Sequence, residues 1–147
     1  MSSKEVQDAI VGAMERWQRV EDASVASTGR VIEKTKNPLI RLVMEIIQRD
    51  SQMHYRVQGM IADSLSVPSR AIQLTPDELG EVWDMIEKHI EIEQRTIDLA
   101  KEALDAIQGK QLLVQEYLLR YLLLDEEKHN AILEKLNLVK KGMYPYG

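Results

Sequence analysis

Proline falls only at breaks between long helix-forming segments, and this placement restricts the chain to helical architectures. Pro38 follows Asn37 and Pro76 follows Thr75, so both prolines stand directly after an N-cap residue. At that first helical position the missing N–H of proline costs nothing. Glu78, three residues after Thr75, adds the spacing of a capping box. Both sites therefore predict the beginning of a helix.

Apolar residues recur at helical spacing along the chain, and no segment shows the strict alternation of a strand. Gly109 marks the break between the last two periodic segments. The pattern predicts an all-α protein, an antiparallel four-helix bundle built from two helical hairpins. The predicted single domain covers residues 1–147, with helices over about 3–35, 38–65, 76–108 and 110–140 and an irregular tail over 141–147.

Composition excludes several classes of protein. The sequence contains no cysteine, which removes disulfides, thiol catalysis and iron–sulfur clusters. The net charge of −5, without a basic block, argues against nucleic acid and anionic membranes as partners. No apolar run is long enough to span a bilayer, and the N-terminal residues lack the apolar core of a signal peptide. We therefore expect a soluble, cytoplasmic protein.

Ionisable residues interrupt the predicted apolar faces at matching heights in the bundle. Seven of them could share one layer: Glu21, Asp50, His54, His89, Glu93, Glu126 and His129. An unpaired buried carboxylate costs several kcal/mol, yet no lysine or arginine projects toward the centre of these faces. A divalent metal would neutralise such a group, and oxygen and nitrogen ligands without sulfur suit iron, manganese or zinc.

The motif Asp-x-x-x-His occurs twice, at Asp50 to His54 and at Asp125 to His129, which is an offset of 75 residues. An offset of this size is about one helical hairpin, so the repeat predicts two similar hairpins. Ligands three or four residues apart lie on one face of a helix, about one turn apart. The pair Glu126 and His129 therefore suits metal binding, as does the pair His89 and Glu93.

The segment Leu-Asp-Glu-Glu-Lys-His, residues 124–129, resembles the final-helix motif of rubrerythrin-like members of the ferritin-like superfamily. Glu93 precedes Glu126 by 33 residues, close to the usual spacing in that family. The resemblance implies a ferritin-like bundle with a centre of two iron or manganese ions. It also implies that Glu93, Glu126 and His129 are ligands in one half of that centre.

The other half departs from the family pattern. Ser51 stands where the family has glutamate, while His54 matches the ligand histidine. Asp50, one turn before His54, is the candidate substitute, and Glu21 would be the carboxylate of the first helix. His89 is an additional imidazole that the ordinary pattern lacks. A single ion held by His54, His89, His129 and Glu93 is therefore an alternative, and such a histidine-rich site suits zinc.

The implied function is an oxidoreductase that acts on peroxide or O₂. Peroxide-reducing rubrerythrins usually carry a cysteine-rich electron-transfer domain, so this chain would take electrons from a separate redox partner protein. The alternative is a non-catalytic interaction or structural bundle. The last predicted helix is apolar around much of its circumference over residues 117–124, which favours a homodimer.

Overall fold

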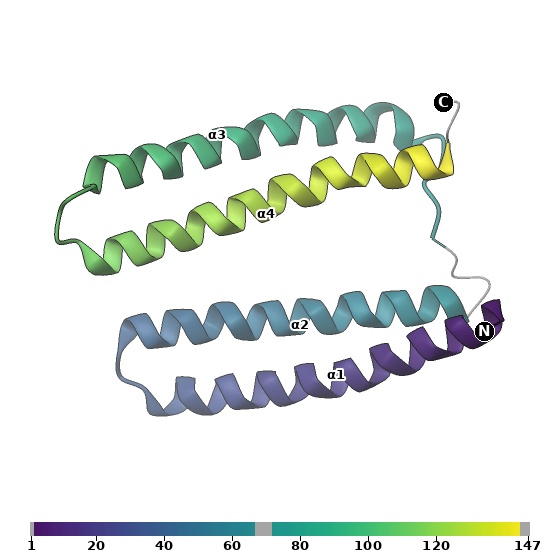
Figure 1. The fold of residues 1–147 in the computed structure, drawn as a ribbon, viewed down its shortest axis with the longest axis horizontal. Coiled ribbons are helices and arrows are strands. Elements are labelled where there is room, and N and C mark those ends of the chain that lie inside the picture. The colour runs from purple at the N-terminus through teal and green to yellow at the C-terminus, as the bar shows by residue number, and fades with distance from the viewer. Residues whose placement is uncertain (1, 67–71, 145–147) are drawn as a thin grey trace. The chain divides into compact units, whose positions relative to one another are not determined.

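The protein consists of two helical hairpins, α1–α2 and α3–α4 (Figure 1). The structure is a computed structural model that describes residues 2–66 and 72–144. The first hairpin lies within residues 1–72 and the second within 73–147. The helices are α1 (Ser3–Lys34), α2 (Pro38–Ser66), α3 (Trp83–Ile107) and α4 (Leu113–Met143), and a π-helical turn, η2 (Glu78–Val82), precedes α3. No strand occurs in this described part of the chain, which confirms the all-helical prediction.

Both helices of the first hairpin begin with side-chain caps. The capping box of α1 pairs Ser2 with Glu5: the Ser2 hydroxyl accepts from the Glu5 N–H at 3.2 Å, and the Glu5 carboxylate accepts from the Ser2 N–H at 2.6 Å. At α2, Asn37 Oδ1 accepts from the N–H groups of Leu39 and Ile40, at 2.9 and 3.2 Å. The helix start predicted from Asn37 and Pro38 is therefore confirmed, with its cap.

The seam where α1 and α2 pack is largely polar. Four of its five buried residues are polar: Glu21, Thr28, Ser51 and Gln58, beside Ala62. Several hydrogen bonds cross this seam, among them those between the Ser24 and Ser51 hydroxyls at 2.8 Å, from Gln48 Nε2 to the Val25 carbonyl at 3.2 Å, and from Gln18 Nε2 to the Tyr55 carbonyl at 3.1 Å. Specific hydrogen bonds, and not only apolar burial, therefore hold this pair of helices together.

The second hairpin begins differently from the prediction. The sequence predicts a regular helix from residue 76, but η2 has π-helical geometry and Gly80 has non-helical angles (φ −94°, ψ −111°). Regular α-helix begins only at Trp83. One half of the predicted capping box is present, because the Thr75 N–H donates to Glu78 Oε2 at 2.8 Å. The contact between Thr75 and Glu78 therefore lies where the chain turns, as predicted. The non-helical angles of Gly80 place the beginning of the regular α-helix at Trp83, later than predicted.

The predicted irregular tail is wrong over residues 141–143, where α4 continues to Met143. Contacts with the segment before η2 account for the extension. The Tyr144 hydroxyl donates to the Leu74 carbonyl, and the Leu74 N–H donates to the Met143 sulfur at 3.4 Å. These contacts hold the last turn of α4 against the beginning of the hairpin. Residues 145–147 of the predicted tail lie outside the described residues.

Trp83 is the largest buried side chain at the open end of the second hairpin. It is 3% exposed, and Lys140 Nζ lies 4.6 Å from the centroid of its ring. A lysine over an indole ring adds a cation–π attraction to the apolar burial. Further along α3, the buried residues are Glu93, Ile97 and Ala100, so one carboxylate lies within an otherwise apolar line.

Gly109 forms the turn between α3 and α4 with a positive φ of 75°, so alanine at this position should destabilise the hairpin. A side chain in this region costs about 1–2 kcal/mol. The matched control is Gly142→Ala, because Gly142 lies in α4 with open space around its Cα, where alanine should stabilise by about 0.5–1 kcal/mol. Urea unfolding of both variants gives the comparison. Equal free energies of unfolding would contradict the strained turn.

Candidate metal centre

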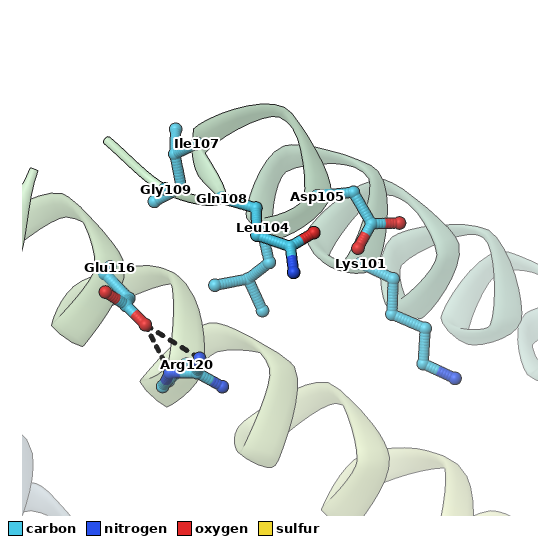
Figure 2. A pocket seen from close by; sticks show the side chains of 8 residues that line it. All are labelled: Lys101, Leu104, Asp105, Ile107, Gln108, Gly109, Glu116 and Arg120. Atoms are coloured by element: carbon cyan, nitrogen blue, oxygen red, sulfur yellow. Dashed lines mark hydrogen bonds and ion pairs between the residues drawn. The ribbon is translucent and has the colours of Figure 1, made fainter.

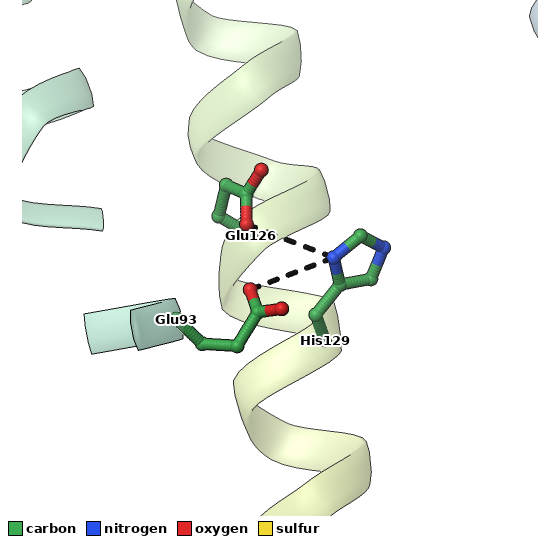
Figure 3. Close-up of side chains that lie close together, drawn as sticks. All are labelled: Glu93, Glu126 and His129. Atoms are coloured by element: carbon green, nitrogen blue, oxygen red, sulfur yellow. Dashed lines mark ion pairs between the residues drawn. The ribbon is translucent and has the colours of Figure 1, made fainter. Parts of the chain in front are cut away.

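Glu93 of α3 meets Glu126 and His129 of α4 in the second hairpin (Figure 3). One ligand atom from each residue lies within 4.8 Å of the others. His129 Nδ1 is 3.6 Å from Glu93 Oε2 and 3.6 Å from Glu126 Oε2. Two ligands about 2.1 Å from one tetrahedral ion are about 3.4 Å apart, so both distances from His129 Nδ1 are close to the spacing that a shared ion requires.

The buried carboxylate of Glu93 is the strongest indication of a ligand here. Glu93 is 7% exposed, and its two oxygens have different surroundings. Oε1 lies 2.9 Å from His89 Nε2, a hydrogen-bond distance. Oε2 is buried and has no hydrogen-bond partner, although it points toward His129 Nδ1. A buried acceptor left without a donor costs about 1–3 kcal/mol, which a bound cation would offset.

The surroundings of Glu93 also favour its ionised form. Its pKa is lowered, first by the side chain of Glu126 and then by the hydrogen bond with His89, while burial opposes both effects. A lowered pKa in the folded state stabilises the fold above the ordinary glutamate pKa, and that stability is lost as the pH falls through the lowered value. Glu93 is therefore an anion at neutral pH, as a metal ligand must be.

The first hairpin holds a related but different group. Glu21 is 6% exposed, and its Oε1 accepts from Gln58 Nε2 at 3.1 Å and lies 3.4 Å from His54 Nδ1. Ser51, which takes the place of Glu126 in the repeat, is bonded to the Ser24 hydroxyl. The structure thus brings Glu21 and His54 together as predicted, but the carboxylate of Glu21 already has an amide donor.

Asp50 does not join this group. Its side chain is exposed, and it has no hydrogen bond or ion pair within residues 2–66 and 72–144. The expected substitution of Asp50 for the missing glutamate therefore has no support within the first hairpin. The reason is helical geometry, because the residues that face α1 are Ser51 and Gln58, and Asp50 lies to one side of that line.

Two residues near the candidate centre escaped the sequence-based set of ligands. Thr96 Oγ1 lies 2.9 Å from Glu126 Oε2, and Asp125 Oδ2 lies 3.2 Å from His129 Nε2. Thr96 follows Glu93 by three residues, as Ser24 follows Glu21, and each hydroxyl contacts the residue three before the histidine. In the sequence, Thr96 could have been found because Ser24 stands at the matching position of the first hairpin. Asp125 could have been found from the repeated Asp-x-x-x-His motif.

A separate pocket of about 290 Å³ lies at the turn end of the second hairpin (Figure 2). Its charged residues carry both signs, and Glu116 Oε1 accepts from Arg120 Nη2 at 2.7 Å and Nε at 3.1 Å. None of the predicted ligands lines it. The lining residues are Lys101, Leu104, Asp105, Ile107, Gln108, Gly109, Glu116 and Arg120. Its balanced charge gives no preference for an anion or a cation.

A smaller pocket of about 250 Å³ reaches the candidate centre itself. Glu126 and Thr96 contribute its polar atoms, and the rest of the lining is apolar: Leu99, Ala100, Leu119 and Leu122. An ion bound by Glu126 would therefore lie beside a space suited to a small, weakly polar molecule.

Within the part of the chain that the structure describes, no helix combines the length and the apolar character needed to cross a membrane. Comparisons with models of protein families, with curated proteins and with solved structures found no match for this chain.

Proposed function

We propose that the protein is a ferritin-like metalloprotein that binds a divalent ion through Glu93, Glu126 and His129. The observation that carries this proposal is the buried oxygen Glu93 Oε2, which has no donor and faces His129 Nδ1 at 3.6 Å. Two carboxylates and one imidazole, without sulfur, match the ligand preferences of iron, manganese and zinc.

The proposed activity is that of a rubrerythrin-like oxidoreductase acting on peroxide or O₂ with an external electron donor. Bound iron or manganese would supply the redox chemistry. Glu93 and Glu126 would hold the ion, and the contact with His89 would keep the Glu93 carboxylate oriented. The pocket beside Glu126 supports this proposal because it offers a small substrate an approach lined mainly by apolar side chains.

The number of ions distinguishes this activity from the main alternative. The resemblance implies two ions, with Glu21 and His54 as ligands of the second. The hydroxyl pair of Ser24 and Ser51, and the amide of Gln58 on Glu21, instead favour a single ion in the second hairpin. A single zinc with a structural role is therefore the second candidate function.

Exposed apolar side chains on α4 support a further alternative, an interaction protein that self-associates. Leu113 is 82% exposed, and Leu124 and Tyr117 are also exposed. Scattered exposed apolar residues are common, whereas several on one helix are typical of an interface. A homodimer is the proposed assembly, and sedimentation at several protein concentrations measures it directly.

Metal content per chain tests the proposed function. The untagged protein is expressed in medium supplemented with iron, manganese or zinc, purified without chelator and analysed by mass spectrometry. We expect at least one ion per chain, and two iron or manganese ions would support the redox centre. One zinc in every medium would favour the structural role. A folded helical protein without metal in all three preparations would refute metal binding.

A further inference from the structure

The buried glutamates of the two hairpins differ in the partner of one oxygen atom. In the second hairpin, Glu93 Oε2 lies 3.6 Å from His129 Nδ1 and has no hydrogen-bond donor among the described residues. In the first hairpin, the oxygen that faces the histidine is Glu21 Oε1, 3.4 Å from His54 Nδ1. This oxygen accepts a hydrogen bond from Gln58 Nε2 at 3.1 Å. The oxygen that is open to an ion in one hairpin therefore has an amide donor in the other.

The repeated Asp-x-x-x-His motif shows that this amide has no equivalent in the second hairpin. Gln58 follows His54 by four residues, so it lies on the same face of α2, about one turn further along. The residue four after His129 is Leu133, whose side chain cannot donate a hydrogen bond. Gln58 is only 3% exposed. A buried amide beside the glutamate is therefore a feature of the first hairpin alone.

Two further positions of the first hairpin are less suited to an ion than their counterparts. Ser51 stands in place of Glu126, and its hydroxyl pairs with another serine hydroxyl at 2.8 Å. Trp17 precedes Glu21 by four residues, where the second hairpin has His89. An indole N–H can only donate a hydrogen bond, so it offers an ion no lone pair. The first hairpin thus has fewer possible ligands at these positions, and its glutamate has an amide partner.

We propose that Gln58 takes the place of a metal ion at Glu21, so that the protein binds one ion, in the second hairpin. An ion on Glu21 Oε1 would have to displace the amide and leave a buried N–H without its acceptor, which is unfavourable. This inference rests on the proposed metal function and deepens it, because it assigns the number of ions. Gln58 is then the residue that determines this number, although it is not a ligand itself.

Counting ions in variants of the full chain tests this proposal, with zinc as the probe and native mass spectrometry as the measurement. We expect one zinc per chain in wild type. The double variant Ser51→Glu, Gln58→Leu restores two features of the second hairpin and should bind one ion more than wild type. Ser51→Glu alone is the matched control and should bind as many as wild type, because the amide still contacts Glu21.

Three results of this count would overturn the proposal. They are two ions in wild type, an additional ion in the Ser51→Glu control, and a helical double variant that gains no ion. Two ions in wild type would at the same time support the proposed redox centre. If wild type binds no zinc, the proposed function fails, whereas a gain of one ion by the double variant would still support the role of Gln58.

A double-mutant cycle in EDTA tests the contact itself without metal, and it remains decisive if the double variant does not fold. We expect the urea midpoint to fall further on Gln58→Leu in wild type, where Glu21 loses its donor, than in Glu21→Leu. Gln58 Oε1, which has no donor among the described residues, is removed in both backgrounds, so its contribution cancels. The same shift in both backgrounds would refute the role of Gln58.

Discussion

Replacing Glu93 with leucine should weaken metal binding by more than about 100-fold, because the loss of a ligand exceeds the effect of losing a ligand's partner. The same change should leave the metal-free protein as stable as wild type or more stable, by about 1 kcal/mol. The reason is that it removes a buried carboxylate with an unpartnered oxygen. Loss of binding without loss of stability is therefore the signature of a metal ligand.

Urea unfolding with and without zinc measures both effects. Zinc at about 100 times its dissociation constant should add about 2.7 kcal/mol to the wild-type free energy of unfolding and nothing to Glu93→Leu. Glu91→Leu, at an exposed position of α3, is the matched control and should keep the response to zinc. If the leucine variant still gained stability from zinc, Glu93 would not be a ligand.

Replacing Trp83 with alanine should destabilise the second hairpin by about 3–5 kcal/mol, the usual cost of truncating a buried aromatic side chain. The change removes the packing at the beginning of α3 and the ring beneath Lys140. Urea unfolding followed by far-ultraviolet circular dichroism measures this loss.

The control for this change is Met85→Ala, because Met85, also on α3, is 62% exposed and its truncation should alter stability by less than about 0.5 kcal/mol. Trp83→Phe should retain part of the wild-type stability, since the phenyl ring keeps much of the buried area. A cost below about 1 kcal/mol for Trp83→Ala would show that the tryptophan is not part of the core of this hairpin.

Local signals in the sequence predicted the helices well where capping chemistry determines the boundary. Asn37 caps α2 as predicted, and Gly109 turns the chain between α3 and α4. The prediction failed at Gly80 and at the end of α4. At Gly80 the chain departs locally from helical angles, whereas the end of α4 depends on contacts between residues far apart in the sequence, such as Tyr144 with Leu74. Helical periodicity contains no information about such contacts.

The candidate centre was predictable only in part for a related reason. The apolar periodicity of a helix marks a broad face, and Glu93 and Glu126 both fall on it. The periodicity does not distinguish the residues that pack directly against the neighbouring helix from the residues at the edges of that face. Asp50 and Ser51 are adjacent in the sequence, yet Ser51 is buried and Asp50 is exposed.

The polar seam of the first hairpin also fixes the register of its helices. An apolar seam gains similar burial after a slip of one turn, about 5.4 Å along the axis. Here such a slip would break several specific bonds at once, including the Ser24–Ser51 pair and the contact of Gln58 with Glu21. Buried polar pairs are known to select one alignment of packed helices. The alignment that places His54 beside Glu21 is therefore set by hydrogen bonds on either side of that pair.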